Sequence, residues 1–383
     1  MLARTKVIFK EILPIKSENF EVLKPLDLPI KILKINGNWP TKNSSKKYLI
    51  YCIILHLLVM EIGTILQLLY LPHVENFFDF TQLVTILPSC IAVCIETFVV
   101  YFYKNELLAV MEMIKDVINE HGMSEKLKTN LLFVDKYMRI LLLLMIVSTS
   151  AFTISGIYYH QLSYKMWFPF EINFCFAIIY QICCLYNYSL VNLVLDILPV
   201  FFIVYTVGML EQLCDNLENI KKSTKGEENR QKLINCIEYH CKIIEINKKI
   251  QKIFSPIFLA RGFLSVAVLC TAIFAILTLS DPAIFGKLVA YVIIMTVTIF
   301  VPCYYGSKLK EISSQVSVSL FQSEWIYEDQ KYQELVKIMI INTGKSLKIS
   351  IADVFDVDLA NFMSICHSVY SAYCICNRMS SGF

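Results

Sequence analysis

The sequence predicts an all-α membrane protein with seven transmembrane helices. Of its 383 residues, 56% are hydrophobic and only 17% are charged, and the mean hydropathy is +0.56. Soluble domains carry about 25% charged residues, whereas several apolar stretches here reach the roughly 20 residues that cross a bilayer. A net charge of +3 is too small to indicate nucleic-acid binding.

Seven candidate spans follow one another along the chain. The fourth is long enough to project beyond the membrane, and the seventh is the most polar. No internal repeat is visible, which argues against a transporter built from inverted repeats. The predicted spans are 48–71, 82–103, 137–159, 174–207, 257–279, 286–305 and 358–379.

The distribution of Lys and Arg predicts the orientation. The segment 1–47 holds ten of them, and the connections 104–139, 208–254 and 307–348 hold six, nine and six. Together these segments contain 31 of the 35 basic residues, and basic residues favour the cytosolic side. We therefore expect a cytosolic N-terminus and an extracellular C-terminus.

The cytosolic connections read as helical extensions of the spans. Apolar residues recur at helical spacing in 208–254 and again in 307–342, where they are Leu309, Ile312, Val316, Leu320, Leu335, Ile338 and Ile340. Such amphipathic helices need a partner for their apolar faces. An interface between subunits is the favoured interpretation, and packing within the chain is the alternative.

The last predicted helix is too polar to face lipid. His367, Ser371 and Ile375 fall on one face, with Ser364 and Ser368 beside them. Because lipid cannot satisfy polar groups, this face must meet protein or water. Three acids, Glu61, Glu96 and Asp196, also lie within apolar spans, where a buried structural pairing is favoured over an ion path.

Several motifs between about 165 and 376 resemble those of the insect odorant receptor family. His367 stands where that family commonly has Lys, and Ala372 where it often has an aromatic residue. The first 160 residues match the family only in hydropathy. The matching segments are Trp167-Phe168-Pro169-Phe170, Asp196, Cys236-Ile237 with His240, Phe254-Ser255, Cys303-Tyr304-Tyr305-Gly306, Leu320-Phe321-x-Ser323-x-Trp325, and Phe362-x-Ser364-Ile365 with Tyr370-Ser371.

This resemblance implies a subunit of an odorant-gated, non-selective cation channel in the plasma membrane of olfactory sensory neurons. The family's members form heterotetramers with a common co-receptor, which carries a long insertion between spans four and five. Here that connection is only about 46 residues, 208–254, which resembles a tuning subunit. The implied partners are a co-receptor, a small volatile organic ligand, permeating cations and membrane lipid.

The resemblance also divides the chain and suggests site residues. The divisions are a cytosolic segment 1–47, six spans with an outer ligand pocket and helical extensions 48–306, a cytosolic anchor helix 307–350, and a pore-lining helix with a short extracellular tail 351–383. Ile375 would form an apolar gate, with His367 and Ser371 near the water-filled path. Leu320 and Trp325 would lie at a subunit interface.

The ligand pocket is placed by resemblance in the outer half of spans two, three, four and six. Aromatic and sulfur side chains with a few hydroxyls suit a small, mostly apolar ligand, although aromatic residues are also common in membrane helices for structural reasons. The candidate residues are Cys90, Phe152, Ser155, Tyr159, Tyr180, Cys184, Tyr188, Tyr291 and Met295.

Other functions remain as alternatives. A gustatory receptor of the same superfamily is the nearest, and a G-protein-coupled receptor is a more distant one because the chain lacks Asp-Arg-Tyr and Asn-Pro-x-x-Tyr patterns. No combination of nucleophile, base and acid indicates an enzyme. No cofactor is expected, and no spacing of Cys, His and acidic residues predicts a metal site.

Overall fold

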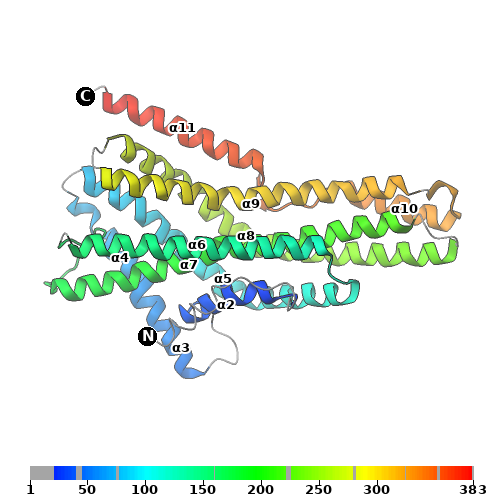
Figure 1. Cartoon of the computed structure of the whole chain (residues 1–383), viewed down its shortest axis with the longest axis horizontal. Coiled ribbons are helices and arrows are strands. Elements are labelled where there is room, and N and C mark those ends of the chain that lie inside the picture. Colours follow the sequence, from blue (N-terminus) through cyan, green and yellow to red (C-terminus); the bar gives the residue numbers. More distant parts are fainter. Residues whose placement is uncertain are drawn as a thin grey trace.

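In the computed structural model, the predicted spans two to six continue as unbroken helices into their polar extensions (Figure 1). The structure describes residues 21–39, 45–74, 77–158, 160–220, 226–278, 282–323, 325–351 and 354–381. Apolar periodicity runs through both parts of each helix. The helices continue across the predicted membrane boundary even where α8 contains Pro256 and α9 contains Pro302. The five helices are α5 (Phe77–His121), α6 (Glu125–Tyr158), α7 (Phe174–Asn219), α8 (Gly226–Thr278) and α9 (Pro282–Gln322).

The first and last spans differ from these five. The first is broken into α3 (Lys46–Leu55), a π-helical turn η2 (His56–Glu61) and α4 (Ile62–Leu68), followed by the short η3 (Leu71–His73). The last is α11 (Leu359–Ser381). Within the described ranges, six helices are long and apolar enough to cross a membrane. α11 has the length, but its polar residues keep it out of that group, as the sequence predicted for the seventh span.

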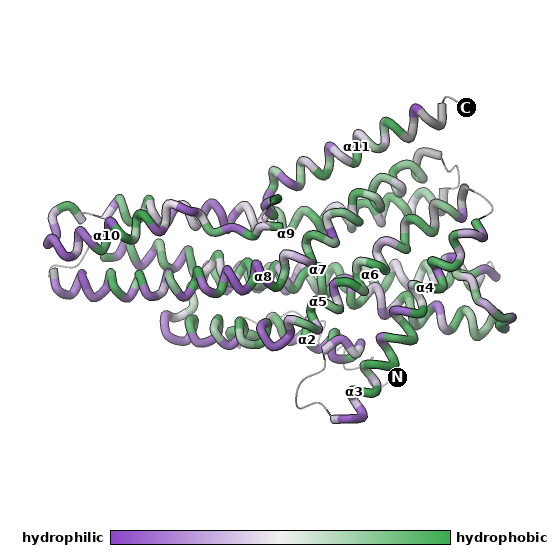
Figure 2. Tube along the Cα trace, turned by 180° about the vertical axis from the view of Figure 1, so that it is seen from behind, coloured by the Kyte–Doolittle hydropathy of each residue, from purple (hydrophilic) through white to green (hydrophobic). Residues whose placement is uncertain are grey.

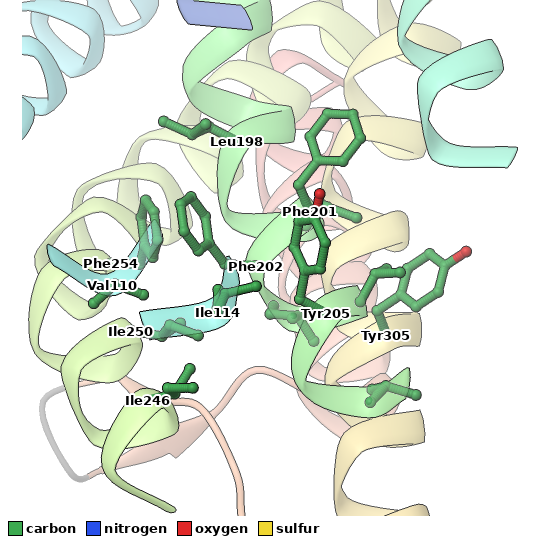
Figure 3. Packing of buried hydrophobic residues seen from close by; sticks show 14 of the residues in the cluster. Val110, Ile114, Leu198, Phe201, Phe202, Tyr205, Ile246, Ile250, Phe254 and Tyr305 are labelled. Atoms are coloured by element: carbon green, nitrogen blue, oxygen red, sulfur yellow. The ribbon is translucent and has the colours of Figure 1, made fainter. Parts of the chain in front are cut away.

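α7 occupies the centre of the bundle. It contacts α2 (Lys24–Ile35), α5, α6, α8, α9 and η2, and 94% of its most apolar 18-residue window is buried. Figure 3 shows Phe201, Phe202 and Tyr205 enclosed by side chains of α5, α8 and α9, with the rings of Phe202 and Phe254 5.4 Å apart. Each large apolar side chain buried in this way gains van der Waals contacts with its neighbours, which is what holds helices together in a membrane.

The N-terminal segment contains a helix that the sequence did not predict. α2 has a proline in its first turn and buries Leu26, Ile32 and Leu33 against the bundle. Two hydroxyl groups of α3 donate to carbonyls at the C-terminal end of α2. The Tyr48 hydroxyl donates to the carbonyl of Lys34 at 2.7 Å, and the Tyr51 hydroxyl donates to the carbonyl of Ile35 at 2.5 Å. These bonds satisfy carbonyls that a helix end leaves without partners.

The region predicted as one anchor helix, 307–350, consists of several elements. It contains the end of α9, the short η5 (Trp325–Tyr327), α10 (Gln330–Thr343) and β1 (Ser350–Ile351). The carboxylate of Asp329 caps α10 by accepting from the Tyr332 amide at 2.9 Å, which starts a new helix after the break. β1 pairs antiparallel with β2 (Phe355–Asp356) just before α11. Hydrophilic residues gather on α10 and on the adjoining ends of α8 and α9 (Figure 2).

Candidate functional site

Three predicted pocket residues lie one turn apart on the same face of α7, and all three bond to the π-helical turn η2. The Tyr180 hydroxyl donates to the carbonyl of Leu58 at 2.7 Å, and the Cys184 thiol donates to that of Val59 at 3.3 Å. The Tyr188 hydroxyl donates to the carbonyl of Met60. A π turn disturbs the regular helical bonding pattern. Three consecutive carbonyls of the first span thus accept from three successive turns of α7.

The same contact brings Cys90 of α5 close to the first span. Gln67 of α4 donates from its amide nitrogen to the Cys90 sulfur at 3.5 Å. Gly63 packs so closely that an added Cβ would lie 3.2 Å from the Cys184 sulfur and 3.3 Å from the Tyr188 hydroxyl. Cys90, Cys184 and Tyr188 therefore lie together in a tightly packed contact between α4, α5 and α7.

Phe152 and Ser155 of α6 lie near the loop between α6 and α7. Phe152 packs beside a small cluster formed by Leu66, Tyr164 and Met166, and Tyr180 also touches this cluster. The Ser155 hydroxyl donates to the carbonyl of Phe152 at 3.0 Å. The remaining candidate of this group, Tyr159, lies outside the described residues.

Tyr291 and Met295 stand one turn apart on α9. The Tyr291 hydroxyl lies 3.2 Å from that of Ser89, the residue before Cys90, so this tyrosine joins α9 to the α5 side of the predicted pocket. Met295 is buried in a separate cluster with Val268, Leu269 and Val369, to which Tyr291 also packs. α9 thus lies between the predicted pocket and α11.

A buried ion cluster joins α5, α7 and α8 within the apolar part of the bundle. One guanidinium nitrogen of Arg261 lies 2.5 Å from Glu96 and 2.9 Å from Asp196, and a second donates to Asn192 at 2.7 Å. All three charged side chains are nearly or fully buried. The predicted structural pairing of Glu96 and Asp196 is therefore found, and Arg261 is the partner that the sequence analysis missed.

Arg261 could have been identified from its position. It is the only charged residue in the predicted fifth span, 257–279. An isolated cation in an apolar span is costly unless an acid pairs with it, and two acids without assigned partners lay in other spans. The third acid, Glu61, lies 3.3 Å from His56 within the first span itself.

The polar face of α11 is exposed, as its composition predicted. His367 and Ser371 are exposed, and Ile375 is 61% exposed. On the other side of the helix, Val369 is buried and packs against α8 and α9. The three predicted pore residues therefore lie away from the bundle, on a surface where α11 meets no other element of this chain that the structure describes.

The base of α11 is fixed to α9 by close backbone contacts. The Ser307 hydroxyl accepts from the amide of Leu359 at 2.8 Å, which caps the start of the helix. A Cβ placed on Gly306 would overlap the carbonyl oxygen of Val357. Lys348 and Lys310 pair with Asp356 at 2.9 and 3.4 Å. Although partial burial opposes it, these lysines hold the pKa of the Asp356 carboxyl below its usual value.

The two predicted interface residues differ in exposure. Leu320 is fully buried in the main hydrophobic cluster of this chain, and Trp325 is half-buried against the same cluster. Leu320 therefore supports the fold of this region from inside. The large apolar side chains that this region exposes are Val318, Phe321, Ile326, Tyr327, Ile338 and Ile341.

We also searched the described side chains for groups that could bind a metal ion. Across the described ranges, no three His, Cys, Asp or Glu side chains are grouped in a way that could hold a metal ion. The arrangement instead offers hydroxyl, thiol and aromatic groups inside a helical bundle, together with one helix that exposes a polar face.

Comparison with known sequences gives a consistent result. The sequence model of the 7tm Odorant receptor family matches residues 76–370. Odorant receptor 46a, isoform A, of Drosophila melanogaster is 26% identical over 206 residues, which cover 53% of this chain and 54% of that protein. Odorant receptor 30a of the same species is 23% identical over 197 residues, 51% of this chain and 50% of its own length. The chain thus spans about half the length of the curated relatives it matches.

The fold matches a solved structure over nearly its whole length. The olfactory receptor OR5 of the insect Machilis hrabei, solved in complex with eugenol, aligns with a TM-score of 0.76. The alignment covers 92% of this chain and 97% of that one at 15% sequence identity. At this identity the likeness concerns the fold alone.

Proposed function

The chain belongs to the 7tm odorant receptor family, and from this premise we propose that it is the odour-tuning subunit of a heteromeric, odorant-gated, non-selective cation channel. The observation that carries the proposal is the exposed polar face of α11, which suits a water-filled path better than lipid. The family match removes the reason to prefer a gustatory receptor or a G-protein-coupled receptor.

The proposal places the protein in the plasma membrane of olfactory sensory neurons, together with a co-receptor. Current recorded from cells that express this chain with a co-receptor, across a panel of volatile compounds, tests it directly. Odour-evoked cation current should require both chains. Evoked current that persists without the co-receptor would argue against a tuning role, and no current for any compound would argue against the channel.

We predict that the N-terminus is cytosolic and the C-terminus extracellular, because 31 of the 35 basic residues lie in the segments assigned to one side. Epitope tags at both ends, read on intact and permeabilised cells, measure this. A C-terminal tag should be accessible on intact cells and an N-terminal tag only after permeabilisation. The reverse pattern would contradict the orientation and revive the G-protein-coupled alternative.

We propose that the ligand binds in the outer half of the bundle, near Tyr180, Cys184 and Tyr188 of α7 and Tyr291 of α9. The solved relative OR5 holds eugenol, a small phenolic molecule. Aromatic rings and thiols suit ligands of this size and polarity. Because the α7 hydroxyls already donate to η2, a ligand with an acceptor oxygen would have to compete with the carbonyls of Leu58 and Met60.

The proposed pore predicts a gain of basal current when Ile375 is replaced. Ile375→Ala should widen an apolar constriction and allow water to enter it, which raises current without odour. Ser371→Cys should become sensitive to thiol reagents in the open channel, once the native Cys374 and Cys376 are replaced. Ile154→Ala serves as a control, because Ile154 is exposed on α6, away from α11. If both variants behave like the parent, α11 does not line the pore.

In the anchor region 307–350, we predict that exposed apolar residues matter for binding the co-receptor and that buried ones matter for the stability of the chain. Replacing Tyr327 and Ile341 with Ser should reduce recovery of the co-receptor complex while leaving the chain itself folded, since Tyr327 is 88% exposed. Leu320→Ala should instead destabilise the chain, by about 2–5 kcal/mol for a buried leucine. Phe133→Ser, which alters an exposed residue on α6, is the control. Unchanged co-purification with the Tyr327 and Ile341 variant would contradict the proposed interface.

A further inference from the structure

A cavity lies between α8, α9 and α11, and none of the nine residues predicted for the ligand pocket is among those lining it. Its volume is about 200 Å³. Ile273 comes from α8, Val292 and Thr296 from α9, and Phe362, Cys366 and Tyr370 from α11. Three helices from different parts of the sequence therefore line the same cavity.

The chemistry of the walls selects an uncharged ligand. All eleven described residues that line the cavity are uncharged, and most of them are aliphatic or aromatic. The Thr296 hydroxyl already donates to the carbonyl of Val292 at 2.8 Å, so it has little to offer a ligand. The cavity is open on one side, where Tyr370 is 66% exposed, so it does not enclose its occupant. Its volume of about 200 Å³ has room for a molecule of about the size of benzene or somewhat larger.

The cavity lies directly behind α11. Val369, which packs beside it, holds the helix to the cluster that contains Met295, whereas His367 and Ser371 face away from the bundle. An occupant would therefore sit between α11 and the helices that support it. Tyr291 and Val292 are adjacent on α9, so this helix separates the cavity from the predicted odorant pocket, to which Tyr291 is joined through Ser89.

We propose that this cavity is a second binding site, for a small uncharged aromatic molecule. The rings of Phe362 and Tyr370 offer edges and faces to an aromatic ligand. Binding itself needs only the fold. An effect of the occupant on the position of α11, and through it on current, rests on the proposed role of α11 in the pore.

Photolabelling of the full-length protein in lipid nanodiscs tests the site. The probe is 3-phenyl-3-(trifluoromethyl)diazirine, an apolar aromatic molecule, and the labelled residues are mapped by peptide mass spectrometry. We expect labels at 292–299 and 362–373 that saturate with probe concentration and that excess propylbenzene displaces. Val292→Trp fills the cavity and should lower this labelling by at least about tenfold.

The matched control is Ile293→Trp, which adds the same side chain at the next residue, where Ile293 is 57% exposed. Its labelling should equal that of the parent. Cys366→Phe fills the cavity from the α11 side. If Val292→Trp fails to fold, Cys366→Phe takes its place in the comparison with Ile293→Trp. Labelling that does not saturate, or that is equal in the filled and control variants, would reflect probe dissolved in lipid and would overturn the site. Absence of odour-evoked current in the parent would bear on the proposed function only.

Discussion

Replacing Arg261 with leucine is expected to be among the most damaging single changes in this protein. The substitution leaves Glu96 and Asp196 buried without their shared cation, and both acids lie in apolar parts of the bundle. Removing one partner of a buried ion pair costs about 3–5 kcal/mol, a large share of the stability of a typical domain. Thermal unfolding of the purified protein and its level at the cell surface measure the loss.

A neutral variant separates charge from packing. In the triple variant Glu96→Gln, Asp196→Asn, Arg261→Gln, no charge remains in this cluster, and the amide groups can still bond to one another and to Asn192. This triple variant should recover most of the surface expression that Arg261→Leu loses. If the triple variant is as damaged as the single one, shape and not charge pairing governs this contact. If Arg261→Leu is tolerated, the cluster does not hold the three helices together.

The second large effect is expected at Gly306. Alanine is usually better than glycine inside a helix by about 0.8–1 kcal/mol, so the substitution would normally stabilise α9. Here the added methyl group would overlap the carbonyl oxygen of Val357. That segment cannot easily retreat, because the Val357 amide donates to the carbonyl of Ile349 at 2.8 Å. Gly306→Ala should therefore displace the base of α11 and change gating.

Gly262→Ala provides the matched comparison. Gly262 also lies inside a long helix, α8, but a Cβ placed there would meet no atom within 4 Å. This variant should be slightly more stable than the parent and should gate normally. The two alanine substitutions are thus expected to have opposite signs in the unfolding temperature. A Gly306→Ala variant with normal stability and odour-evoked current would show that the close contact with Val357 is dispensable.

The sequence predicted the helices well because hydropathy and helical periodicity act along one segment at a time. The fourth span was predicted to begin at residue 174, where α7 begins, and the fifth to end at 279, one residue beyond α8. The polar helical extensions followed from the same periodicity. By contrast, nothing in the composition of His56–Glu61 distinguishes a π turn from an α-helical one, since the turn is stabilised by side chains of α7.

The site could be predicted only in part, because an apolar face does not identify its partner. The pattern around Leu320 correctly marked it as apolar, but only the fold shows that it packs inside this chain. The sequence indicates Tyr180 and Tyr188 only as hydroxyl groups within an apolar span, and the fold shows that both bond to the first span. A local pattern can show that Arg261 needs an acidic partner, but only the fold shows that Glu96 and Asp196 are the acids it meets.

The π turn in the first span also makes the length of that span important. The turn contains one residue more than an α-helical turn would need, and it accommodates that residue locally, so the helix on either side keeps its alignment. Deleting a single residue within 56–61 would leave an ordinary α-helical turn, and Gly63 and Thr64 would still face Tyr188. The carbonyls of the turn would return to regular helical bonding, and Tyr180, Cys184 and Tyr188 of α7 would lose acceptors for their bonds. A chain shortened here by one residue therefore keeps its hydropathy and its helix but loses part of its contact with α7.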